Sequence, residues 1–296
     1  FFSTMPSPFA KTLQTKNTLL ERIAPAIVVA VVLILCGVLY STQWTTTQPA
    51  TNTMPSVTKR PIISYDERTA VLITKQGKVK LSSPSPYEEN SMFYRTGGIK
   101  EEPIFILIHS PTRGSSSKDW NHLYEIIAHQ GTYYAIDLIN YGDSEPNPQT
   151  QKRIHLHDEQ ANHVIEFIQT LFPNPNNKNI ILVAKDEAST IACSVASRLT
   201  SQIKGLFFIA PEYFNDMSDN IETIPMFLMW AKEDKIVPFS KASSFEKNFI
   251  DVTTFYIESI LEEGVAVSEA HNPETLRGEQ LAFNLEEWIN ILQYRD

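Results

Sequence analysis

Four short, almost wholly apolar runs constrain most strongly how this chain can fold. They are Ile104–His109, Ile180–Val183, Leu206–Ala210 and Met226–Trp230. A continuous apolar run of this length is typical of a strand that is buried on both faces. Between such runs lie segments with helical spacing, such as Asp158–Leu171, whose apolar residues recur on one face. We therefore expect an α/β fold with a mostly parallel sheet flanked by helices.

The same patterns predict the other elements of the domain. Further strands are expected at Thr69–Thr74, Met92–Arg95, Tyr133–Leu138 and Thr253–Glu258, and helices at Trp120–His129, Ser189–Leu199, Phe239–Phe249 and Leu281–Leu292. No internal repeat is found, and the segment between Ala210 and Met226 leaves no room for a cap domain. The sequence thus predicts one α/β domain over residues 62–296.

An apolar run without any charge, Ile23–Tyr40, precedes this domain and is followed by a Thr/Pro-rich segment. Its 18 residues are near the lower limit for crossing a bilayer, and signal-peptide cores are usually shorter. Basic residues precede the run, and the next one after it is Lys59, so the amino terminus is expected on the cytoplasmic or matrix side. We predict an amino-terminal segment 1–22, a transmembrane helix 23–40 that contacts membrane lipid, and a tether 41–61.

Two features favour the mitochondrial inner membrane, with a secretory-pathway membrane as the alternative. The first 22 residues are rich in Ser and Thr, carry three basic residues and a single acid, and resemble the remnant of an organellar transit sequence. No Asn-x-Ser/Thr sequon occurs despite many asparagines, which disfavours a secretory lumen.

Charge and cysteine content exclude several classes of function. From Arg60 onward the chain carries 21 basic and 33 acidic residues, so this part repels phosphate backbones and nucleic-acid binding is not expected. Cys36 and Cys193 are the two cysteines, too few for a disulfide scaffold or a Cys-rich zinc module. We expect no cofactor and no metal.

Residues suited to catalysis follow several predicted strands at the edge where α/β folds place ligands. Ser110 and Pro111 follow the first buried strand, Asp186 lies between a strand and a helix, Asp234 follows a later strand, and His271 precedes the last helix. The chain order Asp186, Asp234, His271 corresponds to nucleophile, acid and base, which is the order of an α/β-hydrolase triad.

From about Met92 to Leu292 the chain resembles the α/β-hydrolase superfamily, most closely its small cap-less abhydrolase-domain proteins, one type of which is membrane-anchored. The resemblance rests on Phe93–Arg95, Ile104–Trp120, Ala135–Ser144, Gly205–Pro211 and Ala231–Pro238. It implies that Asp186 stands where those proteins have a serine nucleophile, as does the aspartate of dehalogenase and epoxide-hydrolase relatives. It also implies Asp234 as the acid and His271 as the base.

Several positions depart from the family pattern. Ala184 and Ala188 replace the usual glycines of the nucleophile turn, and Ala270 replaces the glycine before the histidine. The oxyanion loop has Ser110 and then Pro111, which has no N–H to donate. The other oxyanion donor is the amide of Glu187, whose own carboxylate disfavours a developing oxyanion.

Each candidate also has a plain structural interpretation. Asp186 and Ser189 are suited to capping the helix that follows, Asp234 to a turn, and His271 to a solvated loop. An alternative alignment on Asn272-Pro273-Glu274 leaves no histidine at the base position. The cluster His155, His157, Asp158 and His163 has the character of metal ligands, but no further ligand completes a set, and a solvated helix start explains it better.

The departures favour a single-pass membrane protein whose hydrolase-like domain has lost catalysis and serves as an accessory subunit of a membrane complex. The alternative is an active hydrolase for a small ester, amide, epoxide or halide, with Asp186, Asp234 and His271 as its triad. A third interpretation is a ligand-binding module built on the inactive site.

Overall fold

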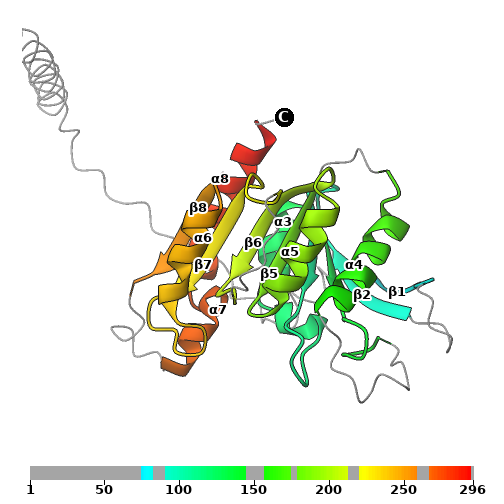
Figure 1. The fold of residues 1–296 in the computed structure, drawn as a ribbon, viewed down its shortest axis with the longest axis horizontal. Coiled ribbons are helices and arrows are strands. Elements are labelled where there is room, and N and C mark those ends of the chain that lie inside the picture. Colours follow the sequence, from blue (N-terminus) through cyan, green and yellow to red (C-terminus); the bar gives the residue numbers. More distant parts are fainter. Residues whose placement is uncertain are drawn as a thin grey trace, which may run out of the picture. The chain divides into compact units, whose positions relative to one another are not determined.

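In a computed structural model of the chain, the structure describes residues 75–82, 91–144, 157–174, 179–212, 220–258 and 267–294. They form an eight-stranded sheet in the order β1-β2-β4-β3-β5-β6-β7-β8 (Figure 1). The strands are β1 Lys75–Lys80, β2 Ser91–Gly97, β3 Ile104–Ile108, β4 Thr132–Ile136, β5 Ile180–Lys185, β6 Ile203–Ile209, β7 Met226–Ala231 and β8 Val252–Ile257. The helices are α3 Tyr124–Gln130, α4 His157–Leu171, α5 Ala188–Arg198, α6 Ala242–Asn248, α7 Pro273–Leu276 and α8 Gly278–Gln293, with 3-10 turns η1 Ser117–Trp120, η2 Phe239–Lys241 and η4 Val267–His271.

Most of the sheet is parallel, as the apolar runs predict. The six strands from β4 to β8 in the spatial order pair in parallel, whereas β1 and β2 pair antiparallel at one edge. Every residue of β3 and of β7 is buried. The predicted fold class, a mostly parallel sheet flanked by helices, is confirmed.

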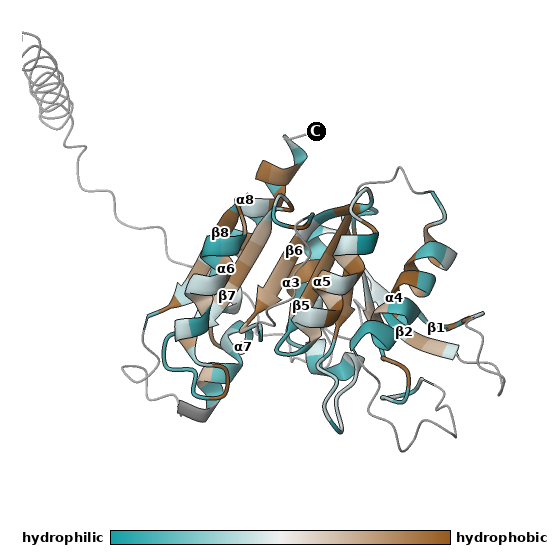
Figure 2. Ribbon diagram, in the orientation of Figure 1, coloured by the Kyte–Doolittle hydropathy of each residue, from teal (hydrophilic) through white to brown (hydrophobic). Residues whose placement is uncertain are grey.

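Helices cover both faces of the sheet. Helices α4, α5 and α6 pack on one face, and α3 and α8 pack on the other (Figure 1). The neighbours Phe207 and Phe208 in β6 point to opposite faces, as the period of two in a strand requires. Phe207 meets Phe227 edge to face at 5.2 Å, and Phe208 packs toward Phe245 of α6. In Figure 2 the inner strands, such as β6 and β7, are accordingly tan to brown, and the helices beside them carry teal segments.

The observed elements differ from the predicted ones in a few places. The predicted strand Thr69–Thr74 lies outside the described residues, and β1 begins at Lys75. The predicted helix Trp120–His129 is divided into η1 and α3, because Ser116 and Asp119 form a capping box that begins a separate turn at Ser117. The one-turn helix α7 directly after His271 has no counterpart in the predictions.

The predicted transmembrane helix 23–40 and tether 41–61 also lie outside the described residues. Among the helices that the structure does describe, none has the length and apolar character needed to cross a membrane.

Candidate active site

Asp186 occupies a sharp turn between β5 and α5 in a backbone conformation that non-glycine residues rarely adopt. Its φ is +52°. The flanking Ala184 and Ala188 are fully buried, so the small residues that a nucleophile turn needs are present without glycine. The carbonyl of Asp186 accepts hydrogen bonds from the amide (3.1 Å) and the hydroxyl (2.6 Å) of Ser189. These bonds hold the strained turn in place.

The helix-cap interpretation of Asp186 is wrong. The residue that caps α5 is Glu187, and it makes no side-chain cap hydrogen bond. The Ser189 hydroxyl donates to the carbonyls of Asp186 and Glu212 rather than accepting from the helix. The Asp186 carboxylate is therefore not committed to the helix, and it lies beside His271 instead.

The structure brings Asp186, His271 and Asp234 together. His271 Nε2 lies 2.9 Å from Asp186 Oδ1, and His271 Nδ1 lies 2.9 Å from Asp234 Oδ2. The exposed fraction of the side chain is 21% for Asp186, 12% for His271 and 0% for Asp234. Asp186 is thus the most exposed of the three side chains, although its Oδ1 atom beside the ring is buried, and Asp234 is sealed behind His271.

Asp234 uses its two carboxylate oxygens for different tasks. Oδ1 accepts hydrogen bonds from the amides of Ile236 (2.8 Å) and Val237 (3.1 Å), which makes the turn after β7. Oδ2 faces the His271 ring at 2.9 Å. One oxygen of Asp234 therefore forms the turn, as the turn interpretation predicts, and the other faces the His271 ring, where an acid of a triad would lie. The alignment that leaves no histidine at this position is excluded by the contact.

The two carboxylates stabilise the protonated form of the His271 ring. Burial favours the neutral ring, but contacts with Asp186 and Asp234 outweigh burial and raise the pKa of His271 to about 9. Near pH 7 the ring is therefore an imidazolium between two carboxylates. Loss of the charge on either carboxylate removes part of this stabilisation and lowers the pKa of His271.

The loop after β3 lies next to the Asp186 turn. The last register pair of β3 and β5 is Ile108 with Ala184, so the loops that follow these two residues leave the sheet at the same edge. His109 is buried and neutral, because burial lowers its pKa. Its Nε2 accepts from the Leu138 amide at 3.0 Å, so Nδ1 donates to the Ser110 carbonyl at 2.8 Å.

This loop offers an incoming substrate few donors. The Ser110 hydroxyl is buried and finds no hydrogen-bond partner among the described residues. Pro111 has no N–H, and its carbonyl accepts the Tyr141 hydroxyl at 2.7 Å. The backbone donor that a complete oxyanion hole takes from this loop is therefore absent at Pro111, as the sequence predicts.

Comparison with known proteins identifies the class of fold. No protein-family model matches the sequence, and no curated protein matches it. A bacterial membrane phospholipase A is similar in structure, with a TM-score of 0.60 at 15% identity over 94% of this chain and 99% of that one. A putative lipase from Acinetobacter baumannii has a TM-score of 0.59 at 12% identity, over 84% of this chain and 100% of the lipase. A haloalkane dehalogenase loop variant from Bradyrhizobium elkanii has a TM-score of 0.55 at 15% identity, over 75% of this chain and 98% of the dehalogenase. The chain has the α/β-hydrolase fold.

Within this α/β-hydrolase fold, an ion pair that sequence reasoning missed lies beside the triad. Lys185, the last residue of β5, donates to Asn272 Oδ1 at 2.5 Å and to Glu274 Oε1 at 2.8 Å. The sequence could have indicated this ion pair, because a lysine at the end of a buried apolar run needs a partner for its charge.

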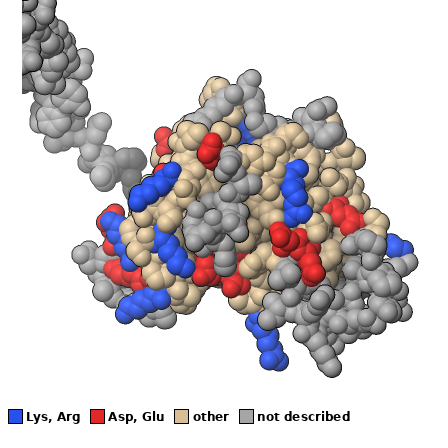
Figure 3. All heavy atoms as spheres, viewed as in Figure 1, with Lys and Arg blue, Asp and Glu red and all other residues tan. Residues whose placement is uncertain are grey.

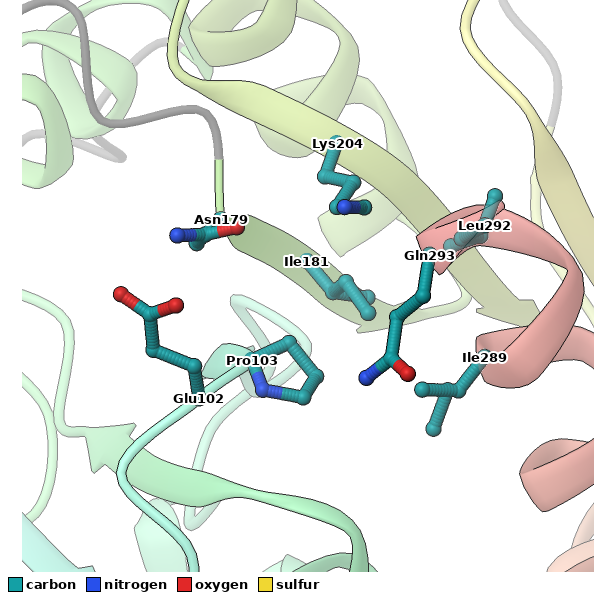
Figure 4. Close-up of a pocket in the computed structure, with 8 residues that line it drawn as sticks. All are labelled: Glu102, Pro103, Asn179, Ile181, Lys204, Ile289, Leu292 and Gln293. Carbon is teal, nitrogen blue, oxygen red and sulfur yellow. The ribbon is translucent and has the colours of Figure 1, made fainter. Parts of the chain in front are cut away.

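A cavity of about 250 Å³ lies at the opposite ends of the strands from Asp186, where β3, β5 and β6 begin (Figure 4). Pro103, Ile181 and Leu292 provide apolar walls, and Glu102 and Lys204 provide opposite charges. Because β5 runs from this cavity toward Asp186 at its far end, the cavity is separate from the triad.

Two further expectations concern ligands. Among the described residues no group of His, Cys, Asp and Glu side chains is arranged to hold a metal ion. His155 lies outside the described residues, and His163 is buried in α4 rather than solvated. On the face seen in Figure 3, the basic and acidic side chains of the described residues are interspersed, without a continuous basic surface of the kind that binds nucleic acid.

Proposed function

We propose that the domain is a hydrolase in which Asp186 attacks an alkyl carbon of a small neutral substrate, an epoxide above all, and His271 directs water to the resulting ester. The observation that carries the proposal is the placement of His271 2.9 Å from both Asp186 and Asp234. A solvated loop histidine and a helix-capping aspartate have no reason to converge in this way, whereas a nucleophile, base and acid do.

In the first step a carboxylate oxygen of Asp186 forms a bond to the alkyl carbon, and the carbon–oxygen bond of the epoxide breaks. The products are an alkyl ester on Asp186 and an alkoxide on the neighbouring carbon. Ester formation removes the negative charge of Asp186, which lowers the pKa of His271. The imidazolium then gives up its proton, and the alkoxide takes it to become an alcohol.

In the second step the neutral His271 acts as a general base. It accepts a proton from water while the water oxygen bonds to the ester carbonyl carbon of Asp186. The tetrahedral intermediate collapses, the ester bond to the alkyl group breaks, and the departing alkoxide takes the proton from His271. The diol leaves, and the carboxylic acid that remains at Asp186 passes its proton to His271 Nε2, which restores the carboxylate and the imidazolium. Asp234 orients the ring and stabilises its charge throughout.

The lack of a donor at Pro111 favours an alkyl substrate over an acyl one. Attack on an ester or amide substrate creates an oxyanion on the substrate, and one missing donor typically costs about 10² to 10³ in rate. Attack on an alkyl carbon creates no oxyanion on a carbonyl, so the missing donor affects only the later hydrolysis of the Asp186 ester, whose tetrahedral intermediate carries negative charge. The departure that argues most strongly against acyl hydrolysis is thus compatible with alkyl transfer.

Charge favours an epoxide over a halide. A halide ion has to leave beside Glu187, the acidic residue that directly follows Asp186, and no proton is required for its departure. An epoxide oxygen needs a proton, and the His271 imidazolium supplies one when Asp186 becomes an ester. Haloalkanes are therefore the second substrate class to assay.

Isotope labelling in a single turnover tests the proposal. Excess protein reacts with an aryl epoxide in water enriched in ¹⁸O, and the diol and the peptide that contains residue 186 are analysed by mass spectrometry. We expect unlabelled oxygen in the diol and ¹⁸O in Asp186, because water attacks the ester carbonyl and not the alkyl carbon. Label in the diol alone contradicts a covalent ester, and the absence of turnover with epoxides and haloalkanes contradicts the proposed activity.

A second candidate function is an accessory subunit of a membrane complex. Pro111 and the Glu187 carboxylate favour it, since both weaken an oxyanion site. Detergent-purified native protein that migrates in a larger assembly and hydrolyses no substrate would support this role, and a monomer would contradict it.

Attachment to a membrane is part of either candidate. We infer that Ile23–Tyr40 spans the bilayer with the amino terminus on the cytoplasmic or matrix side, and we favour the mitochondrial inner membrane. Resistance of the native protein to carbonate extraction is the expected result, and complete release by carbonate contradicts it.

A further inference from the structure

One charged side chain joins the element that carries Asp186 to the element that carries His271. Lys185 immediately precedes Asp186, and its Nζ contacts Asn272 and Glu274, which follow His271 by one and three residues. The exposed fraction is 14% for the Lys185 side chain and 6% for that of Glu274. The ion pair is thus largely withdrawn from water.

The segment that carries His271 has little regular structure of its own to hold it. The 3-10 turn η4 ends at His271, and the four-residue helix α7 follows after Asn272. A single helical turn is not stable alone. Asn272, the N-cap residue of α7, makes no side-chain cap hydrogen bond, because its Oδ1 accepts from Lys185 instead. The position of this segment therefore depends on contacts with the sheet.

From this geometry we infer that Lys185, through Asn272 and Glu274, is a positioning residue that keeps the His271 ring against Asp186 and Asp234. The inference rests on the proposed function and adds residues that hold the base in place without touching the substrate. Because Lys185 adjoins Asp186 in the chain, any shift of the nucleophile turn also moves the anchor of the base.

The two chemical steps depend on this anchor to different extents. Attack by the Asp186 carboxylate needs no general base, whereas hydrolysis of the ester needs a correctly placed neutral His271. A small misplacement of a catalytic group can cost about 10²-fold. Release of the anchor should therefore slow ester hydrolysis far more than ester formation.

The test uses the full chain with the double substitution Lys185→Met/Glu274→Gln. This change removes the ion pair without leaving one buried charge unpaired. We expect ester formation within about threefold of the wild-type rate, ester hydrolysis slower by about tenfold to 10²-fold, and accumulation of the covalent ester in the mass spectrum. Glu274→Gln alone, which keeps shape and one acceptor, should give a smaller change in the same direction.

Lys232→Met/Glu258→Gln is the matched control. Lys232 follows β7 as Lys185 ends β5, and it forms an ion pair of 2.6 Å with Glu258 at the end of β8. Loss of this exposed pair should leave both steps unchanged. A slowing of ester hydrolysis in this control equal to that in the Lys185→Met/Glu274→Gln variant would overturn the inference, because it would trace the effect to the loss of any ion pair at a strand end.

An NMR titration of the His271 ring tests the positioning role without relying on activity. The double variant removes one positive and one negative charge, so its direct electrostatic effect on the ring largely cancels. If the ring leaves its two carboxylates, its pKa falls from about 9 toward 6.5. An unchanged pKa together with unchanged ester hydrolysis, in a variant that melts as a folded protein, overturns the inference.

Failure of the two ideas can be told apart. Wild-type protein that forms no ester contradicts the proposed activity, and the titration still decides whether Lys185 positions His271. Wild-type protein that turns over, beside a double variant with the same rates and the same ring pKa, contradicts the positioning role alone.

Discussion

Two loops at the same edge of the sheet, the one after β5 and the one after β3, differ in how much of a hydrolase site they retain. The β5 loop holds Asp186 at φ +52°, between two fully buried alanines, with its carboxylate on His271. The β3 loop has Pro111 where a backbone donor is needed. One loop keeps the geometry that creates a nucleophile, and the other lacks a group that stabilises an oxyanion.

The difference teaches that substitutions in an active site need to be weighed by the step that each one affects. Alanine replaces the usual glycine at Ala184, Ala188 and Ala270, and the sharp turn at Asp186 and the position of His271 are still formed. Pro111 removes a donor that acyl transfer uses. Under the proposed function, these substitutions favour alkyl transfer over acyl transfer, and the contacts among Asp186, His271 and Asp234 are still formed.

Removal of the nucleophile should have the largest effect. In Asp186→Ala we expect epoxide turnover to fall by about 10⁴-fold or more, because no covalent ester can form. The measurement is the steady-state rate, with circular dichroism to show that the fold persists. Retention of a tenth of the activity would sink the idea that Asp186 is the nucleophile.

Removal of the base should separate the two steps. In His271→Gln we expect turnover to fall by about 10³-fold, within the range for loss of a general base, while the ester on Asp186 still forms and accumulates. Rapid-quench mass spectrometry measures both. Equal loss of ester formation and ester hydrolysis would show that His271 acts in the first step as well.

The ion pairs of His271 should make stability depend on pH. The pKa of His271 is raised from 6.5 to about 9 on folding, so the folded state binds the proton more tightly than the unfolded state. The resulting stabilisation is complete below pH 6.5 and is lost as the pH rises through 9. After solvent screening it amounts to about 1–2 kcal/mol.

Urea unfolding at pH 6 and pH 10 measures this contribution. The free energy of unfolding of wild-type protein should fall between the two pH values by more than that of His271→Gln. Parallel pH profiles for the two proteins would show that the ring is not held between its carboxylates in solution.

Restoration of the missing donor should have the smallest effect. In Pro111→Gly the loop regains an N–H, and we expect hydrolysis of an activated ester to rise by up to about tenfold, less than a preorganised donor provides. The rate at which an epoxide forms the ester on Asp186 should stay within about twofold. If the rate with the epoxide rose and the rate with the ester did not, the assignment of substrate class would be reversed.

Much of the fold could be predicted from local pattern. The apolar runs predict β3, β5, β6 and β7, because a strand covered on both faces has no polar position to interrupt it. The helix boundaries were less predictable, and α7 was missed, because a single turn held by tertiary contacts leaves no periodic signal.

The sequence predicted which residues belong to the candidate site, but it did not predict that their side chains contact one another. Chain order and resemblance identified Asp186, Asp234 and His271, while each retained a local interpretation as cap, turn or solvated side chain. Those interpretations depend on contacts within a few residues. The contacts that decide between them join positions 37 and 85 residues apart.

The sequence by itself determined the class of fold, the acidic charge of the domain and the absence of an N–H at Pro111, because these follow from composition, short-range periodicity and covalent structure. Only the tertiary structure decided that the Asp186 carboxylate faces His271, that Asp234 contacts both a turn and the His271 ring, and that Lys185 contacts Asn272 and Glu274. Strands distant in the chain end at one edge of the sheet, and the distances between their side chains exist only after the sheet has formed.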